Sequence, residues 1–399
     1  MPIKIFYIDR FTYYTTQIFA DLQKIISNNN NYEILFVGPQ KNNDKSWLSE
    51  NTIKGEKRVW KYGHYIRNLY NFIKKEQPDI VHISFEWRMF GPRIATLKLP
   101  LLFLLLRIFT KTKIILSLHP ATLSKDHSKW IIMKEVLPPK IPRFFFNSFV
   151  KFFIKSLCNL SHKIIADTFL QKSGLTEFYK INPEKIHVAP LIFPASNVQI
   201  NIEKKKKFTS QFNNKKIILC FGVISPRKSI HTIIKAFANI SDDIQDYVLV
   251  ISGMTTDDYK PYEKMLKNLV TQHNLENRVF FTGYVDDEET EILFDLAVIA
   301  LYVYYPSADA GGSVFYAIYH KVPCIVSTGG YFDELFTKED ALFVEYDNES
   351  HISKAILELS INDDLKSKIQ QKMTNFAKKI STESTAAKYF KIYEKTVKL

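Results

Sequence analysis

The chain has 399 residues, 46% of them hydrophobic and 24% charged, which allows large buried cores and argues against a disordered protein. A length of this order predicts two or three domains. The three cysteines lie far apart, which argues against a disulfide scaffold or a zinc ribbon and favours a reducing compartment, while the formal net charge of +13 favours an anionic partner. The longest apolar run, 97–109, is shorter than the ~20 residues of a membrane-spanning helix.

The first half of the sequence alternates strand-length apolar runs with stretches of helical period. We expect the first of these runs to be a buried strand rather than part of a signal peptide. Because the runs are almost uninterrupted Val, Ile, Leu and Phe, we expect parallel strands that are covered by helices on both faces. The expected strands are Ile3–Asp9, Tyr32–Gly38, Ile80–Phe85, Lys113–His119, Lys163–Asp167 and Ile186–Leu191, with helices at Thr15–Ser27 and His64–Lys75.

The second half repeats this alternation after a polar, lysine-rich stretch without apolar period, Pro194–Asn214, which is typical of a linker. We therefore expect a first α/β domain at 1–195, a linker at 196–214, a second α/β domain at 215–380 and a terminal helix at 381–399. The strands expected in the second domain are Lys216–Val223, Tyr247–Gly253, Val279–Val285, Ala297–Tyr305, Pro323–Thr328 and Ala341–Glu345.

Most of the excess basic charge lies in residues 88–163, which carry a formal charge of +12. Within this segment one helical stretch combines large apolar residues with lysines, a pattern typical of a helix on a membrane surface. An apolar face buried in the first domain, with a solvated basic face outside, is the alternative. The apolar residues are Phe144, Phe145, Val150 and Ile154, and the lysines are Lys151 and Lys155.

The chain has only 12 glycines, about 3% where about 7% is usual. Seven of them lie at or just past the carboxyl end of a strand expected in the second domain. That edge of a parallel sheet is where α/β folds bind ligands, and glycine there allows close backbone approach or positive φ. We therefore expect a ligand-binding rim, with ordinary strand-to-helix turns as the alternative. The seven are Gly222, Gly253, Gly283, Gly311, Gly312, Gly329 and Gly330.

Two segments of the second domain have the features of a phosphate site. After the strand that ends at Gly222, Arg227 and Lys228 stand where a helix begins, and cations beside a helix N-terminus favour a phosphate or diphosphate. The loop Ala-Gly-Gly-Ser at 310–313 opens another helix and can offer consecutive backbone N–H groups to a phosphate. Neither segment has the spacing of a dinucleotide-binding fingerprint or a P-loop.

In its second half the chain resembles the retaining glycosyltransferases of the GT-B fold, in particular their large group-four family. The matching features occur in the family's order across 216–335: F-G-x(4)-R-K before a helix, a V-L-V-I-S-G strand, N-R-V-x-F-x-G-x-V, a P-S with a glycine-rich helix start, and G-G-x-x-x-E. The first half is similar through the strand ends Pro-Asp-Ile-Val-His82 and Leu116-Ser-Leu-His119. The resemblance implies an α/β, GT-B fold of two Rossmann-like, doubly wound parallel-sheet domains facing a cleft. It also implies a C-terminal helix, carrying Tyr389 and Tyr393, that crosses back to the first domain.

The resemblance further implies roles for single residues. The family has two glutamates around the glycine-rich loop; here Asp309 lies near the first position, and Tyr316 occupies the second, which holds the ribose of the donor. His119 matches the histidine that hydrogen-bonds the transferred sugar, with a turn histidine as the alternative. Arg227 and Lys228 would stabilise the departing diphosphate without a metal. The other residues expected around the nucleotide sugar are Gly222, Gly253, Gly283, Gly311, Gly312 and Ser313.

We therefore expect a metal-independent, retaining hexosyltransferase that uses no cofactor. It would move a sugar from a UDP- or GDP-linked donor to a glycan or lipid-linked glycan, in the synthesis of cell-surface polysaccharide or glycolipid. We expect it in the cytoplasm, peripherally bound to the anionic inner face of the cell membrane. A catalytically inactive nucleotide-sugar-binding subunit is the alternative, whereas an epimerase would need carboxylates that the sequence lacks. Nucleic-acid binding is not expected, since none of its usual motifs accompanies the charge.

Overall fold

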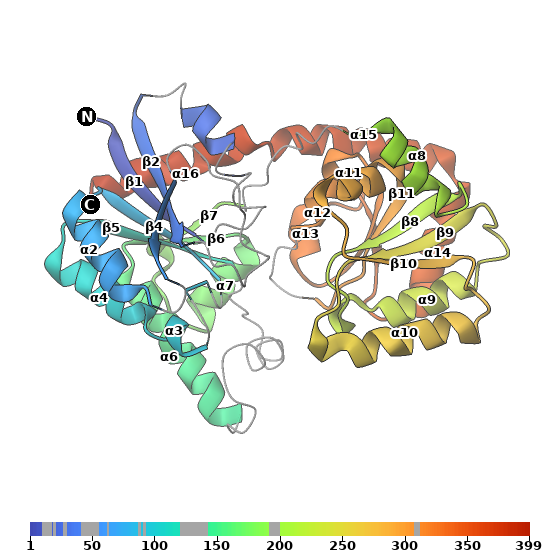
Figure 1. Ribbon diagram of the computed structural model, residues 1–399, viewed down its shortest axis with the longest axis horizontal. Coiled ribbons are helices and arrows are strands. Elements are labelled where there is room, and N and C mark those ends of the chain that lie inside the picture. Colours follow the sequence, from blue (N-terminus) through green and yellow to red (C-terminus); the bar gives the residue numbers. More distant parts are fainter. Residues whose placement is uncertain are drawn as a thin grey trace. The chain divides into compact units, whose positions relative to one another are not determined.

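The computed structural model describes residues 1–9, 18, 21–26, 30–40, 56–61, 64–86, 89–90, 93–119, 143–190, 200–306 and 312–399. These residues form two compact units, each built around one sheet (Figure 1). Unit 1 consists of the described residues up to 190 together with 381–399, and unit 2 consists of 200–306 and 312–380. The two parallel-sheet α/β domains expected from the sequence are thus confirmed.

The sheet of unit 1 has seven parallel strands in the order β3-β2-β1-β4-β5-β6-β7. Its order reverses between β1 and β4, and doubly wound sheets bind ligands at the carboxyl ends of the strands at such a point. Six strands coincide with the apolar runs of the sequence. The edge strand β3 was not expected, because its sequence, Glu-Lys-Arg-Val-Trp, is largely polar. The strands are β1 Ile3–Ile8, β2 Tyr32–Pro39, β3 Glu56–Trp60, β4 Ile80–Phe85, β5 Lys113–Leu118, β6 Lys163–Ala166 and β7 Ile186–Val188.

Helices cover both faces of this sheet (Figure 1). Helices α2, α4 and α6 pack on one face, over a core that includes Leu102 and Phe103. The terminal helix α16 packs Tyr389 and Tyr393 on the other face, and the Tyr393 hydroxyl lies 2.7 Å from Nδ1 of the buried His82. The predicted return of the terminal helix to the first domain is confirmed. The helices of this unit are α2 Ile66–Glu76, α3 Arg93–Thr96, α4 Leu99–Phe109, α6 Arg143–Leu160, α7 Phe169–Glu177, η2 Pro183–Lys185 and α16 Thr382–Val397.

The burial of residues on helix α6 corrects the prediction that its apolar stripe faces a membrane. Val150 and Ile154 are buried in the core of unit 1, because α6 packs beside α4 and against the sheet. Half of the stripe is therefore the inner face of the helix, which is the alternative reading of the sequence. The side chains of Phe144 and Phe145 lie outside the described residues. No helix in the described part of the chain is long and apolar enough to span a membrane.

The sheet of unit 2 has six parallel strands in the order β10-β9-β8-β11-β12-β13, all six of them expected from the sequence. Its order reverses between β8 and β11. Helices α9 and α10 cover one face and α11 and α12 the other (Figure 1). The strands are β8 Lys216–Phe221, β9 Tyr247–Ser252, β10 Val279–Gly283, β11 Ala297–Tyr302, β12 Cys324–Ser327 and β13 Leu342–Val344. The helices are α8 Ile202–Ser210, η3 Pro226–Lys228, α9 Ile230–Ala238, η4 Asp257–Tyr259, α10 Lys260–Gln272, α11 Asp287–Leu296, α12 Val314–Tyr319, α13 Tyr331–Leu335, α14 Glu349–Ile361 and α15 Asp363–Lys379.

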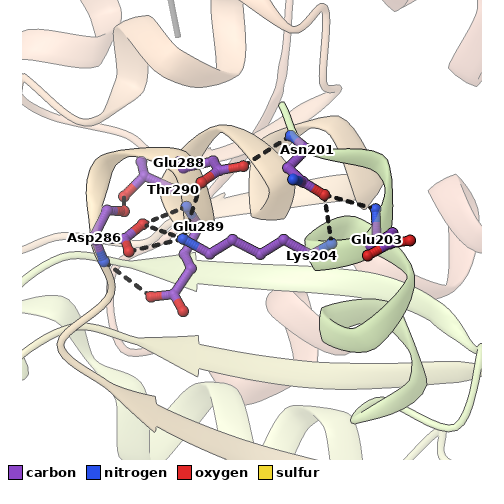
Figure 2. Close-up of polar contacts among 7 residues, drawn as sticks. All are labelled: Asn201, Glu203, Lys204, Asp286, Glu288, Glu289 and Thr290. Carbon is purple, nitrogen blue, oxygen red and sulfur yellow. Dashed lines mark hydrogen bonds and ion pairs between the residues drawn. The ribbon is translucent and has the colours of Figure 1, made fainter. Parts of the chain in front are cut away.

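Helix α8 shows that the linker prediction is wrong for its segment, which belongs to unit 2. Asn201 caps the helix by accepting hydrogen bonds from two backbone N–H groups of its first turn. The ammonium of Lys204 lies 2.8 Å from Asp286 and 3.1 Å from Glu288, so it ties α8 to the start of α11 (Figure 2). The sequence predicted a linker here because the acids that pair with Lys204 lie more than 80 residues later in the chain.

Candidate functional site

The clearest candidate site of unit 2 lies at the carboxyl ends of β8 and β11, where the strand order reverses. The last residue of β8 is Phe221, and its carbonyl oxygen accepts a hydrogen bond of 2.6 Å from the ammonium of Lys228. The hydroxyl of Tyr304, just after β11, lies 3.4 Å from the same oxygen. The structure thus brings one of the two predicted cations to the edge at which such sheets bind ligands.

Gly222 and Gly253 make room for this arrangement. The backbone of Gly222 has a φ of +100°, and a Cβ on it would lie 2.5 Å from the Lys228 ammonium nitrogen. A Cβ on Gly253 would lie 2.3 Å from the carbonyl oxygen of Gly222, because the chains that leave β8 and β9 touch there. Both positions therefore require glycine. Their predicted contact with a ligand stays a prediction.

The ammonium of Lys228 is the central charge of this edge. The residue is only 5% exposed, and burial lowers its pKa to about 7; the Cys220 thiol opposes this shift and the positive Arg227 adds to it. An ammonium has three donors, of which the Phe221 carbonyl takes one. Anionic oxygens placed near the other two would favour the charged form and raise the pKa again. The group is therefore suited to bind an anion.

Tyr304 links the two predicted cations. Its ring centre lies 5.3 Å from the guanidinium carbon of Arg227 and 5.2 Å from the ammonium nitrogen of Lys228, within the range of cation–π attraction. The backbone N–H of Tyr305 donates to the Arg227 carbonyl at 2.7 Å, which fixes the chain after β11 to the turn after β8. Tyr304 was not expected at the site, because in the sequence it belongs to an apolar strand-length run.

Asp347 anchors the turn that carries both cations and was also missed. Its carboxylate accepts a hydrogen bond of 2.6 Å from the Ser229 hydroxyl and another from Thr232, at the start of α9. Ser229 has a left-handed backbone with φ of +48°, uncommon for serine, and this contact helps to hold it. Burial raises the pKa of Asp347, but the two hydroxyl donors together with His231 and Lys235 outweigh burial and leave the pKa lowered. The partners are 118 residues apart in sequence, so no local pattern reveals them.

The loop before α12 supplies one more predicted residue. The carbonyl of Ser313 accepts a hydrogen bond of 2.8 Å from the hydroxyl of Tyr302, and its own hydroxyl lies 3.4 Å from that of Tyr304. Gly312 directly precedes it. At the end of the edge strand β10 the carbonyl of Gly283 accepts the N–H of Gly253 at 2.9 Å, so Gly283 joins the rim through its backbone. Asp309 and Gly311 lie outside the described residues.

Tyr316 lies on the first turns of α12 and packs among aromatic rings. Its ring stacks on Phe294 with 5.3 Å between centroids, and its centroid lies 6.2 Å from that of Phe221, at the end of β8. The tyrosine therefore stands close to the carboxyl edge of the sheet. Its expected role at the ribose of the donor stays a prediction.

In unit 1, His119 directly follows β5 at the carboxyl edge of the sheet. Its Nδ1 lies 3.0 Å from Oδ2 of Asp167, and its Nε2 lies 2.9 Å from Oγ of Ser84. Burial lowers the pKa of His119, but the negative charges of Asp167, Glu86 and Asp9 outweigh it and raise the pKa to about 9. The ring is therefore protonated at neutral pH and donates from both nitrogens. Ser84 accepts one of these bonds, and its hydroxyl is also hydrogen-bonded to Tyr7.

Gln171 holds this histidine and its carboxylate in place. The residue lies on α7 and is fully buried. Its side-chain nitrogen donates to the carbonyl of His119 at 3.1 Å, and its side-chain oxygen accepts the N–H of Asp167 at 2.7 Å. Neither Asp167 nor Gln171 was expected at the site, although Asp167 ends an expected strand just as His119 does.

The predicted site residues thus belong to both units, with His119 in unit 1 and with Arg227 and Lys228 in unit 2. Their joint action on one donor stays a prediction. Among the residues that the structure describes, no group of three or more His, Cys, Asp or Glu side chains is placed to hold a metal ion.

Comparison with known proteins identifies the architecture. Residues 201–380 match the family described as Glycosyl transferases group 1. The chain is 24% identical over 388 residues to the uncharacterized glycosyltransferase MJ1069 of Methanocaldococcus jannaschii. The aligned region covers 94% of this chain and 93% of that protein. Among solved structures, sucrose-phosphate synthase from Thermosynechococcus elongatus has a TM-score of 0.72 at 14% identity, covering 98% of both chains. Anabaena HepE, solved with UDP and glucose, has a TM-score of 0.69 at 15% identity over the whole of both chains.

These likenesses confirm the GT-B fold, and the family match lies on the unit that holds Arg227 and Lys228. The narrower assignment to the group-four family stays a prediction. The chain therefore has the GT-B fold, and residues 201–380 match the group 1 glycosyltransferases.

Proposed function

We propose that the chain is a retaining glycosyltransferase that takes a sugar from a UDP- or GDP-linked donor and needs no divalent metal. The observation that carries the proposal is the buried ammonium of Lys228, beside Arg227, where the strand order of unit 2 reverses. A diphosphate supplies the anionic oxygens that such a group favours. The match of the same unit to group 1 glycosyltransferases supports this reading, as does the UDP bound to the similarly folded HepE.

In the proposed reaction, the bond between the anomeric carbon and the diphosphate oxygen breaks, and an acceptor hydroxyl oxygen bonds to the same face of that carbon. The hydroxyl proton passes to the departing phosphate oxygen. Negative charge grows on the diphosphate in the transition state, so cations already aimed at it lower the barrier. Arg227 and Lys228 have this role, and the backbone N–H groups of Gly312 and Ser313 add to it. His119 holds the transferred sugar from unit 1.

We further propose that the acceptor is a glycan or a lipid-linked glycan and that the protein works in the cytoplasm, at the anionic inner surface of the cell membrane. The basic charge of the first half supports an anionic surface as partner. Val150 and Ile154, half of the apolar stripe from which a membrane contact was expected, are buried and are not available for this contact.

Calorimetric titration with UDP, GDP, UMP and GMP tests the donor site. We expect one of the two diphosphates to bind at least tenfold more tightly than its monophosphate, and Lys228→Met to remove that difference. NMR of the product formed from the matching nucleotide sugar then gives the anomeric configuration, which should be that of the donor. Equal affinity for diphosphate and monophosphate would contradict the proposed site.

The second candidate is a nucleotide-sugar-binding subunit without activity. It is favoured by Tyr316, an aromatic residue stacked on Phe294 where the resemblance places a carboxylate. The two candidates differ in one outcome. Tight diphosphate binding without transfer to any glycan, lipid-linked glycan or water would support the binding subunit.

A further inference from the structure

We propose that the outer face of α4 in unit 1 is a docking surface for an anionic lipid bilayer. Helix α4 is apolar on both sides. Its inner residues lie in the core of the unit, but its outer side is also apolar and exposed, with Ile108 61% and Phe109 57% accessible. A helix that is apolar all round is normally buried or in contact with lipid. The exposed apolar residues of this face are Leu101, Leu104, Ile108 and Phe109.

The spacing of these residues makes one continuous stripe. Leu101, Leu104 and Ile108 are three and four residues apart, so they lie above one another on the same side of α4. Helices α2 and α6 flank α4 on the same face of the sheet (Figure 1). Phe152 on α6 is 72% exposed and adds a large apolar side chain to this layer.

The charge around the stripe selects an anionic surface. Helices α4 and α6 contain no acidic residue, and Glu76, the one acid of α2, is paired with Lys4. Arg107 lies on α4 itself, and its guanidinium contacts the neutral His162, whose pKa is lowered to about 4 by burial and neighbouring cations. Apolar residues framed by cations are typical of a face that enters the interface of an anionic bilayer. The exposed cations of this layer are Arg67, Lys74, Lys75, Lys98, Arg107, Lys111 and Lys155.

A hollow beside the stripe offers a place for a lipid phosphate. A cavity of about 750 Å³ lies where α4 ends, and Ile108 and Phe109 line it together with Lys74, Lys111 and Lys113. Asp79 also lines it, but its carboxylate accepts the backbone N–H of Lys4 at 2.8 Å. The hollow lies at the amino ends of β4 and β5, and His119 lies at the carboxyl end of β5. Docking here therefore leaves the candidate site of unit 1 uncovered.

The same charges disfavour a second copy of the chain as the occupant of this face. Two such faces in contact would bring like charges together around the apolar stripe, and like charges at an interface are strongly unfavourable. An anionic bilayer accepts the apolar side chains and the cations at once. The inference does not depend on enzymatic activity, since vesicle binding is measured without substrate.

Sedimentation with vesicles tests the surface. We expect most of the full-length protein to sediment with vesicles containing about 30% anionic lipid at about 0.15 M salt, and little of it with neutral vesicles. Leu104→Glu and Ile108→Glu should each reduce the bound fraction at least fivefold, as should Lys74→Glu combined with Lys111→Glu. The matched controls are Ile361→Glu and Lys354→Glu on α14 of unit 2, both exposed and both expected to bind like the wild type.

Circular dichroism and thermal melting establish that each variant is folded, and calorimetry with UDP or GDP follows unit 2 separately. Equal binding of wild type and Ile108→Glu would overturn the proposal, and so would equal binding to neutral and anionic vesicles. Self-association of the wild type that Leu104→Glu abolishes would assign the face to a second copy instead. A docking variant that loses vesicle binding but keeps nucleotide affinity would support the proposal.

Discussion

Replacing Lys228 with methionine keeps the long apolar stem of the side chain and removes its ammonium. If this group stabilises the departing diphosphate, the loss should cost about 2–4 kcal/mol in the transition state, by analogy with the removal of one preorganised donor. Turnover with the correct nucleotide sugar should therefore fall about a hundredfold or more. The measurement is kcat with saturating donor and acceptor. Turnover like that of the wild type would remove Lys228 from the catalytic machinery.

The same substitution should change stability in a pH-dependent way. Burial lowers the pKa of Lys228 to about 7 in the folded protein, whereas the unfolded chain has an ordinary value near 10.5. Between these values the unfolded chain binds more protons, so wild-type stability rises with pH across this window. The penalty for burying the charge is fully present below pH 7 and is on the order of 5 kcal/mol, since each pKa unit corresponds to about 1.4 kcal/mol.

We therefore expect the free energy of unfolding of Lys228→Met, relative to the wild type, to be highest near pH 6. It should fall by a few kcal/mol as the pH approaches 10. Urea unfolding at several pH values measures this difference. Lys264→Met, which changes an exposed lysine on α10, is the control and should show no such trend. A difference that stays flat with pH for Lys228→Met would refute the buried ammonium on which the reasoning rests.

Three further predictions follow from single contacts. Gly253→Ala should destabilise unit 2 by several kcal/mol in urea unfolding, because its Cβ would overlap the Gly222 carbonyl at 2.3 Å. The pKa of His119 is raised to about 9 in the folded protein, whereas its ordinary value in the unfolded chain is 6.5. The stabilisation from its charged interactions is therefore complete below pH 6.5 and is lost as the pH rises through 9. The difference in free energy of unfolding between the wild type and His119→Gln should shrink across that window. Tyr316→Glu should lower the melting temperature more than Tyr316→Phe does, because only the first change removes the ring that stacks on Phe294.

Most of the fold could be predicted from the sequence because both sheets are parallel and buried on both faces. Such strands are predominantly apolar runs, as in Ile80–Phe85 and Tyr247–Ser252, and they need no long-range information to be recognised. The missed strand β3 lies at a sheet edge, where polar residues are tolerated and the apolar signal disappears. The lysine-rich α8 was missed for a related reason, since Lys204 pairs with Asp286, a partner remote in sequence.

The candidate site was predictable only where chemistry and position coincide in one short segment. Arg227 and Lys228 follow a strand that is succeeded by Gly222, so a local pattern reveals them. Asp347 and Gln171 act by holding other residues, through contacts with Ser229 and with His119. Such a role depends on tertiary packing, and nothing in the neighbouring sequence distinguishes these two from other polar residues.

The cations of the two candidate sites, His119 in unit 1 and Lys228 in unit 2, have different charged neighbours. This difference predicts a change in bound protons when a diphosphate binds. In unit 1 the charge of His119 is balanced by Asp167, Glu86 and Asp9, so its proton is already held. In unit 2 the described groups that shift the pKa of Lys228 are the thiol of Cys220 and the guanidinium of Arg227. A bound diphosphate would bring the anion that favours the charged ammonium and raise its pKa.

Binding of the nucleotide diphosphate at pH 8 should therefore be accompanied by uptake of close to one proton, because Lys228 is mostly uncharged there before binding. Calorimetric titration in two buffers that differ in ionisation enthalpy measures the number of protons directly. In Lys228→Met the uptake at pH 8 should vanish, whereas Lys264→Met should behave as the wild type. Uptake that persists in Lys228→Met would assign the proton to another group. Binding without uptake in the wild type would mean that the ammonium keeps its proton in the free protein, and that burial alone does not govern its charge.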